Sequence, residues 1–275
     1  MTLEPEIERL LREGRQAHVA VVSPRGPHVT PELYAWSGGR LWFWFAHTTL
    51  KAKVLAASPR VAALVTVGSR SAVIDGEVDL IDVRRPGTLL GSPGRGLRAA
   101  CAVGTYVARN AEDLGAFARD LGTGRLGWRP PPSRVLASLE PRGGALVEDG
   151  RLVGTGAVAR LRPGRGADGP RPGGEPVVVA LPGPRVAPGR WFAEEAELWV
   201  DPVLLDLAEV SGPVPVAVVA DEYVAPGPAA KVGTLLRGTA ERQGRGGSLA
   251  VVADTLTSWD GIETETHRAA DAPGR

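Results

Sequence analysis

The first residues that could do chemistry are two lysines, Lys51 and Lys53, which follow a pair of threonines at Thr48 and Thr49. Lysine is rare in this chain: only Lys231 joins these two, and arginine supplies all the other basic positions. Free N–H groups at a helix N-terminus, threonine hydroxyls and a first-turn lysine together favour an anion. The stretch TTLKAK therefore indicates either a grip for a phosphate group or a capped surface helix with two solvated lysines.

No larger catalytic or metal-binding motif accompanies the lysines. The four histidines show no HxxxH or HExxH spacing, the single cysteine completes no zinc set, and no GxSxG stretch is present. The glycine-rich stretch GSPGRG at 91–96 lacks the Lys-Ser/Thr ending of a phosphate-binding P-loop. We therefore expect no metal site, and the catalytic residues remain unknown from the sequence.

The composition is that of a globular protein, 43% hydrophobic and 23% charged. With 32 basic and 31 acidic residues there is no surplus charge to attract nucleic acid, so we expect no nucleic-acid partner. The lone Cys101 cannot form an internal disulfide, which is typical of a reducing compartment. Because no stretch approaches the ~18 apolar residues of a membrane span and the chain starts without a signal peptide, we expect no membrane partner and a cytoplasmic location.

Apolar periodicity predicts one helix followed by an antiparallel β unit. Ile7, Leu10 and Leu11 recur at helical spacing after Pro5, which suits a first helical turn. Alternating and continuous apolar runs bounded by SPRG, SGGR and GSR turns predict strands. The expected elements are three strands within 17–46, a helix at about 49–57, strands at 60–67 and 71–81, and a closing hairpin at 134–150.

The composition also divides the chain into two units. The stretch RPGRGADGPRPGGE at 162–175 holds too many glycines and prolines to bury an apolar core, which indicates a linker. The predicted organisation is a first unit at 1–150 with a helical insertion near 86–127, a linker at 151–175, a second and degenerate unit at 176–265, and a disordered tail at 266–275.

The second unit repeats the pattern of the first. A shift of 154 positions places Pro213 on Pro59 and Leu204 on Leu50, and the strand after each proline is apolar. Farther on, GTLLRGTAE resembles SAVIDGEVD, and SWDG resembles the end of LVEDG. The shared order of strand, helix, proline, strand, glycine-centred strand and closing strand predicts an ancient duplication.

The pieces SPRGPHVTP, GGRLWFWF, TLKAKVL, SPRV and VIDGEV follow one another in the first unit. In this order they resemble the pyridoxamine 5′-phosphate oxidase-like superfamily of FMN-binding split barrels. The resemblance implies a mainly β (α+β) fold, a split β-barrel, and together with the internal repeat it predicts two tandem related barrels in this chain. It also implies that flavin mononucleotide (FMN) lies between two barrels, as it does in the family's dimers.

The resemblance assigns a cofactor site residue by residue. The turn at Thr49 and Lys51 is expected to hold the phosphate, and the ring is expected against the strands at 29–31 and 44–45. Two positions depart from the family pattern, because Leu50 replaces a common arginine and Phe45 replaces a frequent threonine. The residues expected to bind the cofactor are Val29, Thr30, Pro31, Trp44, Phe45, Thr48, Thr49, Lys51 and Ser71.

In the second unit the shift of 154 places apolar residues or proline at the grip: Pro202, Val203, Leu205 and Leu207. One working site per chain is therefore expected, in a homodimer or an intramolecular pseudo-dimer. The implied function is that of an FMN-dependent oxidoreductase, transferring hydride or electrons to or from a small-molecule substrate with a separate reductant. Two alternatives stay open: a deazaflavin-dependent reductase on the same fold, and a non-catalytic protein that binds flavin or haem.

Overall fold

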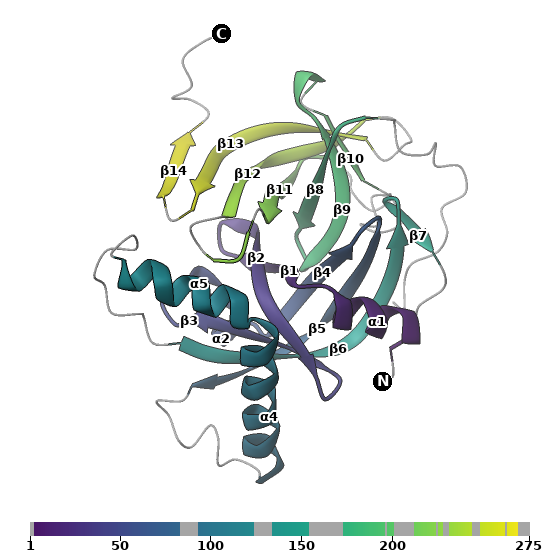
Figure 1. Cartoon of the computed structure of the whole chain (residues 1–275). Helices are drawn as coiled ribbons and strands as arrows, with labels where there is room; N and C mark the ends of the chain where they lie inside the picture. The colour runs from purple at the N-terminus through teal and green to yellow at the C-terminus, as the bar shows by residue number, and fades with distance from the viewer. Residues whose placement is uncertain are drawn as a thin grey trace.

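The structure is a computed structural model that describes residues 3–82, 93–123, 134–153, 173–195, 197–200, 212–223, 225–227, 231–243, 248–261 and 263–268. Figure 1 shows a second barrel stacked on a first, with the labelled helices attached to the first. Among the described residues, no helix is long and apolar enough to cross a membrane.

The first barrel is a sheet that closes on itself. Its strand order is β3-β2-β1-β4-β5-β6-β7, and β3 also pairs with β6, so that six strands form the ring. The elements are α1 (Pro5–Glu13), β1 (Gln16–Ser23), β2 (Gly26–Ser37), β3 (Arg40–Ala46), α2 (Leu50–Ala57), β4 (Arg60–Val67), β5 (Arg70–Asp82), α4 (Pro93–Arg109), α5 (Ala111–Gly122), β6 (Arg134–Glu148) and β7 (Arg151–Val153).

Helix α1 packs on this barrel through the face predicted from its periodicity. Ile7, Leu10 and Leu11 are buried in the same apolar cluster as the inward residues of the strands. Leu11 also anchors the helix by accepting a hydrogen bond of 2.8 Å from the buried Tyr34 hydroxyl. Gly14 is the C-cap residue of the helix. A Cβ atom at this position would lie only 2.3 Å from Val65 Cγ1, so glycine is what lets strand β4 approach closely.

The second barrel repeats the topology. Its strand order is β10-β9-β8-β11-β12-β13-β14, with an additional pairing of β10 with β13 that matches the closure of the first barrel. The predicted mainly β fold with two tandem related barrels is therefore confirmed. The elements are β8 (Glu175–Leu181), β9 (Arg185–Phe192), η1 (Ala193–Glu195), β10 (Glu197–Val200), β11 (Val214–Tyr223), β12 (Lys231–Arg242), β13 (Ser248–Asp260) and β14 (Glu263–Arg268).

A shared β-bulge marks equivalent points in the two barrels. The register shifts at Gly76 between β5 and β6, and at Gly238 between β12 and β13. A Cβ atom on Gly76 would lie 2.1 Å from the Glu140 carbonyl oxygen, and one on Gly238 would lie 2.0 Å from the Val252 carbonyl oxygen. Only glycine fits such an approach of one backbone to another. The correspondence of GTLLRGTAE with SAVIDGEVD is thus confirmed by geometry.

The shift of 154 positions is wrong by one residue in the strand after the proline. Gly76 pairs with Val61, whereas the equivalent Gly238 pairs with Val216. The structural shift in this strand is therefore 155, and it places Val61 and Val216 in the interiors of their own barrels. A one-residue slip turns every side chain to the other face of a sheet, so this correction decides which residues face the second barrel.

Three boundaries differ from the expectation. Residues 134–148 form the single strand β6 rather than a hairpin, because the PRGG stretch is absorbed by the bulge opposite Gly76. Residues 151–153 of the expected linker form β7, and residues 266–268 of the expected disordered tail end strand β14. The parts of these predictions at 154–172, 201–211 and 269–275, including the lost grip at 202–207, lie outside the described residues.

The barrels meet along an apolar seam. Ala20, Val29 and Leu64 of the first barrel pack in one cluster with residues of the second barrel that include Val178 and Val219. These side chains point away from the interiors of their own barrels, because inward and outward residues alternate along each strand. The seam brings β1, β2 and β4 against β8 and β11.

Candidate functional site

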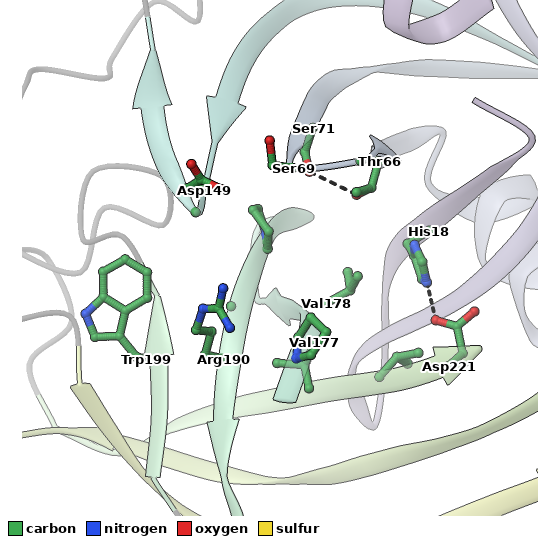
Figure 2. A pocket seen from close by; sticks show the side chains of 16 residues that line it. His18, Thr66, Ser69, Ser71, Asp149, Val177, Val178, Arg190, Trp199 and Asp221 are labelled. Carbon is green, nitrogen blue, oxygen red and sulfur yellow. Dashed lines mark hydrogen bonds and ion pairs between the residues drawn. The ribbon is translucent and has the colours of Figure 1, made fainter. Parts of the chain in front are cut away.

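Two clefts open at the seam. The covered cleft has a volume of about 350 Å³ and lies between Pro31, Glu32, Leu33 and Trp44 of the first barrel and Lys231 of the second, with α4 and α5 over it. The open cleft has a volume of about 500 Å³ and lies between Pro188, Gly189, Arg190 and Trp199 of the second barrel and β4, β5 and the β6–β7 turn of the first (Figure 2). Both volumes are in the range of small-molecule sites.

The two clefts are equivalent positions of the duplicated fold. His18 and Val178 are equivalent, because they pair with Leu64 and Val219, which lie 155 positions apart. Pro31 pairs with His18 and Pro188 pairs with Val178, so residues 31–33 correspond to residues 188–190. By the registers of β3 and β10, Trp44 corresponds to Trp199. Lys231 precedes Gly238 by seven residues, as Ser69 precedes Gly76. Each cleft thus combines a Pro–Trp wall from one barrel with a residue from the other.

Helices α4 and α5 distinguish the covered cleft from its counterpart. Tyr106 of α4 sets its ring edge-on to Trp44, with 5.7 Å between ring centroids and 81° between planes. Asp113 of α5 fastens the insertion to the second barrel, since its carboxylate accepts hydrogen bonds from the Tyr223 hydroxyl at 2.7 Å and the Gly227 backbone N–H at 3.1 Å. The insertion therefore closes this cleft from one side.

The predicted helix N-terminus forms as the sequence indicates. Thr49 is the N-cap of α2, and its hydroxyl accepts a hydrogen bond of 3.3 Å from the Ala52 N–H and donates one of 2.8 Å to the Ala46 carbonyl oxygen. Thr48 is exposed, and Lys53 is exposed on the same helix. The cap hydroxyl is thus already engaged with the backbone of its own turn.

Lys51 points into the protein rather than into solvent. Its side chain is only 4% exposed, and the ammonium group donates to Thr30 Oγ1 and Glu32 Oε1 and lies 5.1 Å from the centre of the Phe45 ring. Burial lowers the pKa of Lys51, although the Glu32 carboxylate acts in the opposite direction. Because Glu32 also lines the covered cleft, Lys51 stands directly behind the cleft wall.

The structure brings the predicted residues together only in part. Pro31 and Trp44 line the covered cleft. Val29 is fully buried in the seam cluster, and Thr30 and Phe45 contact Lys51 behind the wall. Ser71 lies in the open cleft, where its hydroxyl is 2.9 Å from that of Thr66.

Two cationic side chains line the covered cleft beside the carboxylates of Glu32 and Asp113. Lys231 of β12 lines the covered cleft, and its charge also lowers the pKa of Lys51, after burial and against the effect of Glu32. Arg134 of β6 lines the same cleft and donates a hydrogen bond of 3.1 Å to the Trp44 carbonyl oxygen. Two of the chain's three lysines therefore meet at one site, although they come from different barrels.

A second cationic contact crosses the seam nearby. Arg237 of β12 contacts His28 Nδ1 of β2. Burial, together with the charges of Arg237 and Lys51, lowers the pKa of His28 to about 3. His28 is therefore neutral at ordinary pH and accepts the hydrogen bond from Arg237.

The covered cleft fits the ring of a flavin better than the helix turn fits its phosphate. Trp44, Tyr106 and Phe117 supply aromatic walls, and Lys231 and Arg134 supply cations within the cleft. By contrast, Lys51 is neutralised by Glu32 behind the wall. A phosphate at this turn requires the Lys51–Glu32 pair to open.

Sequence reasoning missed the cleft residues that come from outside the first β unit. Asp113 and Phe117 of the helical insertion, Arg134 and Lys231 gave no motif. The rarity of lysine was a usable signal, since Lys231 was the only lysine left outside the TTLKAK stretch. Among the described residues, no group of three or more His, Cys, Asp or Glu side chains is placed to hold a metal ion.

The fold defines a tandem split barrel with clefts of about 350 and 500 Å³ between its two halves. Residues 4–95 match the sequence profile of the family described as pyridoxamine 5′-phosphate oxidase. The resemblance of this chain to the pyridoxamine 5′-phosphate oxidase-like superfamily is therefore confirmed. No curated protein matches the chain.

Solved structures also resemble about half of the chain. One is an FAD-binding protein from Mesorhizobium loti, 19% identical over 53% of this chain and 97% of that chain, with a TM-score of 0.36. Another is a pyridoxamine 5′-phosphate oxidase-related, FMN-binding protein from Nostoc punctiforme, 18% identical over 54% and 87%, with a TM-score of 0.38. An F420 reductase is 21% identical over 50% and 94%, with a TM-score of 0.31.

Proposed function

We propose that the covered cleft binds FMN or a deazaflavin coenzyme and that the protein is an oxidoreductase acting on a small molecule. One observation carries the proposal: Pro31 and Trp44, both expected to contact the ring, line a cleft at which the two barrels meet and into which Lys231 brings a cation. The profile match of the first barrel supports the same class of cofactor.

When bound, the flavin supplies the hydride or electron chemistry. The chain's own residues bind and orient it. Trp44 and Tyr106 offer apolar surface to a planar ring, while Lys231 and Arg134 offer positive charge to an anionic tail. Helix α5, fastened through Asp113, excludes water from one side of the cleft.

Glu32 and Lys51 form an exchangeable pair in this proposal. Glu32 is 26% exposed and lines the cleft, whereas Lys51 is nearly buried behind it. A phosphate that enters the cleft competes with the Glu32 carboxylate for the Lys51 ammonium group, and the displaced carboxylate can reach solvent. The pair therefore tunes the affinity for the anionic tail rather than presenting an open grip.

The two barrels replace the two subunits of a dimeric split barrel in this proposal. The seam buries apolar side chains from both barrels, and residues of both line the covered cleft. A single chain is thus sufficient to build the site. Sedimentation analysis of the cofactor-loaded protein tests this, because binding by a monomer supports an intramolecular pseudo-dimer and binding confined to a dimer contradicts it.

The proposal is tested by the absorption spectrum of the purified protein and by titration with FMN and with deazaflavin coenzyme. We expect one cofactor per chain for the preferred coenzyme, and reduction of the bound flavin by a nicotinamide or reduced-deazaflavin donor. Lys231→Ala removes a charged partner worth about 1.5–3 kcal/mol, so we expect affinity to fall about 10- to 100-fold. Lys53→Ala, on the exposed face of α2, is the matched control and should leave affinity unchanged.

The same experiment separates the alternatives. Binding of neither coenzyme at micromolar concentration overturns the proposal and leaves only the scaffold in common with the family. A bound cofactor that no donor reduces and no acceptor reoxidises points instead to a non-catalytic binding protein.

A further inference from the structure

We propose that the open cleft is a second small-molecule site, which binds a phenol or a planar heteroaromatic N–H compound through His18. The ligand donates its O–H or N–H to His18, while its ring lies between the apolar strands of the cleft. This inference does not depend on flavin binding, because none of the residues that carry it lines the covered cleft.

A carboxylate from the second barrel holds His18 in place. His18 Nε2 of β1 lies 2.5 Å from Asp221 Oδ1 of β11, and Gln16 Nε2 donates a hydrogen bond of 2.6 Å to the other oxygen of the same carboxylate. The side chains of His18 and Asp221 are only 13% and 9% exposed. Figure 2 shows these two side chains pointing toward each other at the cleft.

This arrangement fixes which imidazole nitrogen is available. Burial raises the pKa of Asp221, but the interactions with His18, the hydrogen bond from Gln16 and the charge of Lys231 together lower it below its ordinary value. An ionised carboxylate can only accept hydrogen bonds, so Nε2 of His18 carries the proton. In the tautomer with the proton on Nε2, Nδ1 is an acceptor, and it is buried without a hydrogen-bond partner among the described residues. A ligand O–H or N–H satisfies it.

The remaining walls suit a flat ring with a polar group at its far side. Val177, Val178 and Val219 supply apolar surface. Trp199 and Arg190 lie across the cleft from His18 in Figure 2, where an indole face and a guanidinium group can contact an aromatic ring or an acceptor group.

The polar pair is not a by-product of the duplication. Leu64 pairs with His18, and the equivalent Val219 pairs with Val178, so Val178 stands where the repeat of His18 belongs. The shift of 155 likewise places Thr66 at the position of Asp221. The equivalent positions, Val178 and Thr66, therefore carry neither an imidazole nor a carboxylate. Burying the Asp221 carboxylate against an imidazole adds little net stability compared with apolar packing, so we account for this unrepeated pair by ligand binding.

The chemistry at this site is a proton transfer that needs no further reactant. With an acidic phenol, the O–H bond of the ligand breaks and an N–H bond forms at His18 Nδ1, whereas a less acidic O–H or N–H group donates a hydrogen bond to Nδ1 without transfer. The phenol becomes an anion, and His18 becomes an imidazolium between that anion and the Asp221 carboxylate. Asp221 acts as a positioning residue, because it holds the ring and offsets the new positive charge.

The test uses 4-nitrophenol, whose ionised form has its own absorption band, and 4-nitroanisole, which has the same ring without the acidic proton. At a pH where the free phenol is mostly protonated, we expect saturable binding of 4-nitrophenol with the band of the ionised form, and at least tenfold weaker binding of 4-nitroanisole. His18→Gln should abolish the band and weaken binding about tenfold or more. His267→Gln, on exposed β14, is the matched control.

Thermal unfolding of each variant separates binding from folding. Should His18→Gln not fold, Arg190→Ala at the other side of the cleft must weaken 4-nitrophenol binding, and Asp221→Asn must reduce the band more than it reduces binding. Equal binding of the two probes, or an unchanged band in His18→Gln, overturns the proposal. So does a stoichiometry of two flavins per chain with the second displaced by Arg190→Ala, which assigns the open cleft to the cofactor.

Discussion

At the scale of single residues, the lysine-poor composition pointed to the right neighbourhood but not to the right geometry. Lys231 lines the covered cleft, but Lys51 lies behind the cleft wall with its ammonium group turned inward onto Glu32 and Thr30. A sequence pattern can place a lysine in the first turn of a helix. It cannot show that the Glu32 carboxylate of β2 will pair with the Lys51 ammonium group, because this contact depends on how β2 packs relative to α2.

The Lys51–Glu32 pair predicts a strong coupling in stability. Glu32→Gln leaves the buried Lys51 ammonium group uncompensated and should lower the free energy of unfolding by about 3 kcal/mol, whereas Lys51→Met should cost less, because the Glu32 carboxylate lines the cleft and can reach solvent. The double variant, with both charges removed, should recover most of that loss. Urea unfolding of the four proteins measures the coupling, and strictly additive losses would show that the two side chains do not pair in solution.

His28 predicts a dependence of stability on pH. Its pKa of about 3 in the folded protein lies below the usual value of 6.5, so below pH 6.5 the unfolded chain takes up a proton that the folded protein refuses. The free energy of unfolding therefore decreases as the pH falls below 6.5, and His28 contributes a slope of about 1.4 kcal/mol per pH unit to this decrease. His28→Gln should remove that slope between pH 6 and pH 4.5. An identical slope in wild type and variant, measured by urea unfolding, refutes this role of His28.

At the scale of elements, strands β1 to β5 and both ends of α2 were predictable because they depend on local alternation, turns and capping. The register of the repeated strands could not be predicted. Pro59 and Pro213 align by chemistry, but the pairing of Gly76 and Gly238 fixes the strands one residue away from that alignment. Register is decided by partners distant in sequence, which a single sequence read along its length does not reveal.

The bulge glycines predict a sharp contrast between alanine substitutions at the two bulges and one in helix α4. Gly76→Ala and Gly238→Ala each force a Cβ atom onto a backbone carbonyl oxygen that cannot move aside, and each should destabilise its barrel by more than about 2 kcal/mol. Gly104→Ala in α4 meets nothing within 4 Å and should stabilise by about 0.5–1 kcal/mol. Thermal unfolding decides, and a tolerated Gly76→Ala is incompatible with the close approach.

At the scale of the whole molecule, the sites belong to neither barrel alone. Trp44 and Lys231 lie 187 positions apart along the chain and meet only because the seam brings β3 toward β12. The resemblance of residues 4–95 to a family could predict only the part of such a site that the first barrel contributes. The rest of the site, and the helices that cover it, depended on how a duplicated fold packs against itself.

Binding of FMN in the covered cleft is tested most directly by a crystal structure of the protein with FMN at saturating concentration. We expect one FMN per chain in the covered cleft, its ring beside Pro31 and Trp44 and its phosphate within hydrogen-bond distance of Lys231 or Arg134. FMN found in the open cleft instead, or no bound FMN at a concentration that saturates the titration, would show that the covered cleft is not the cofactor site.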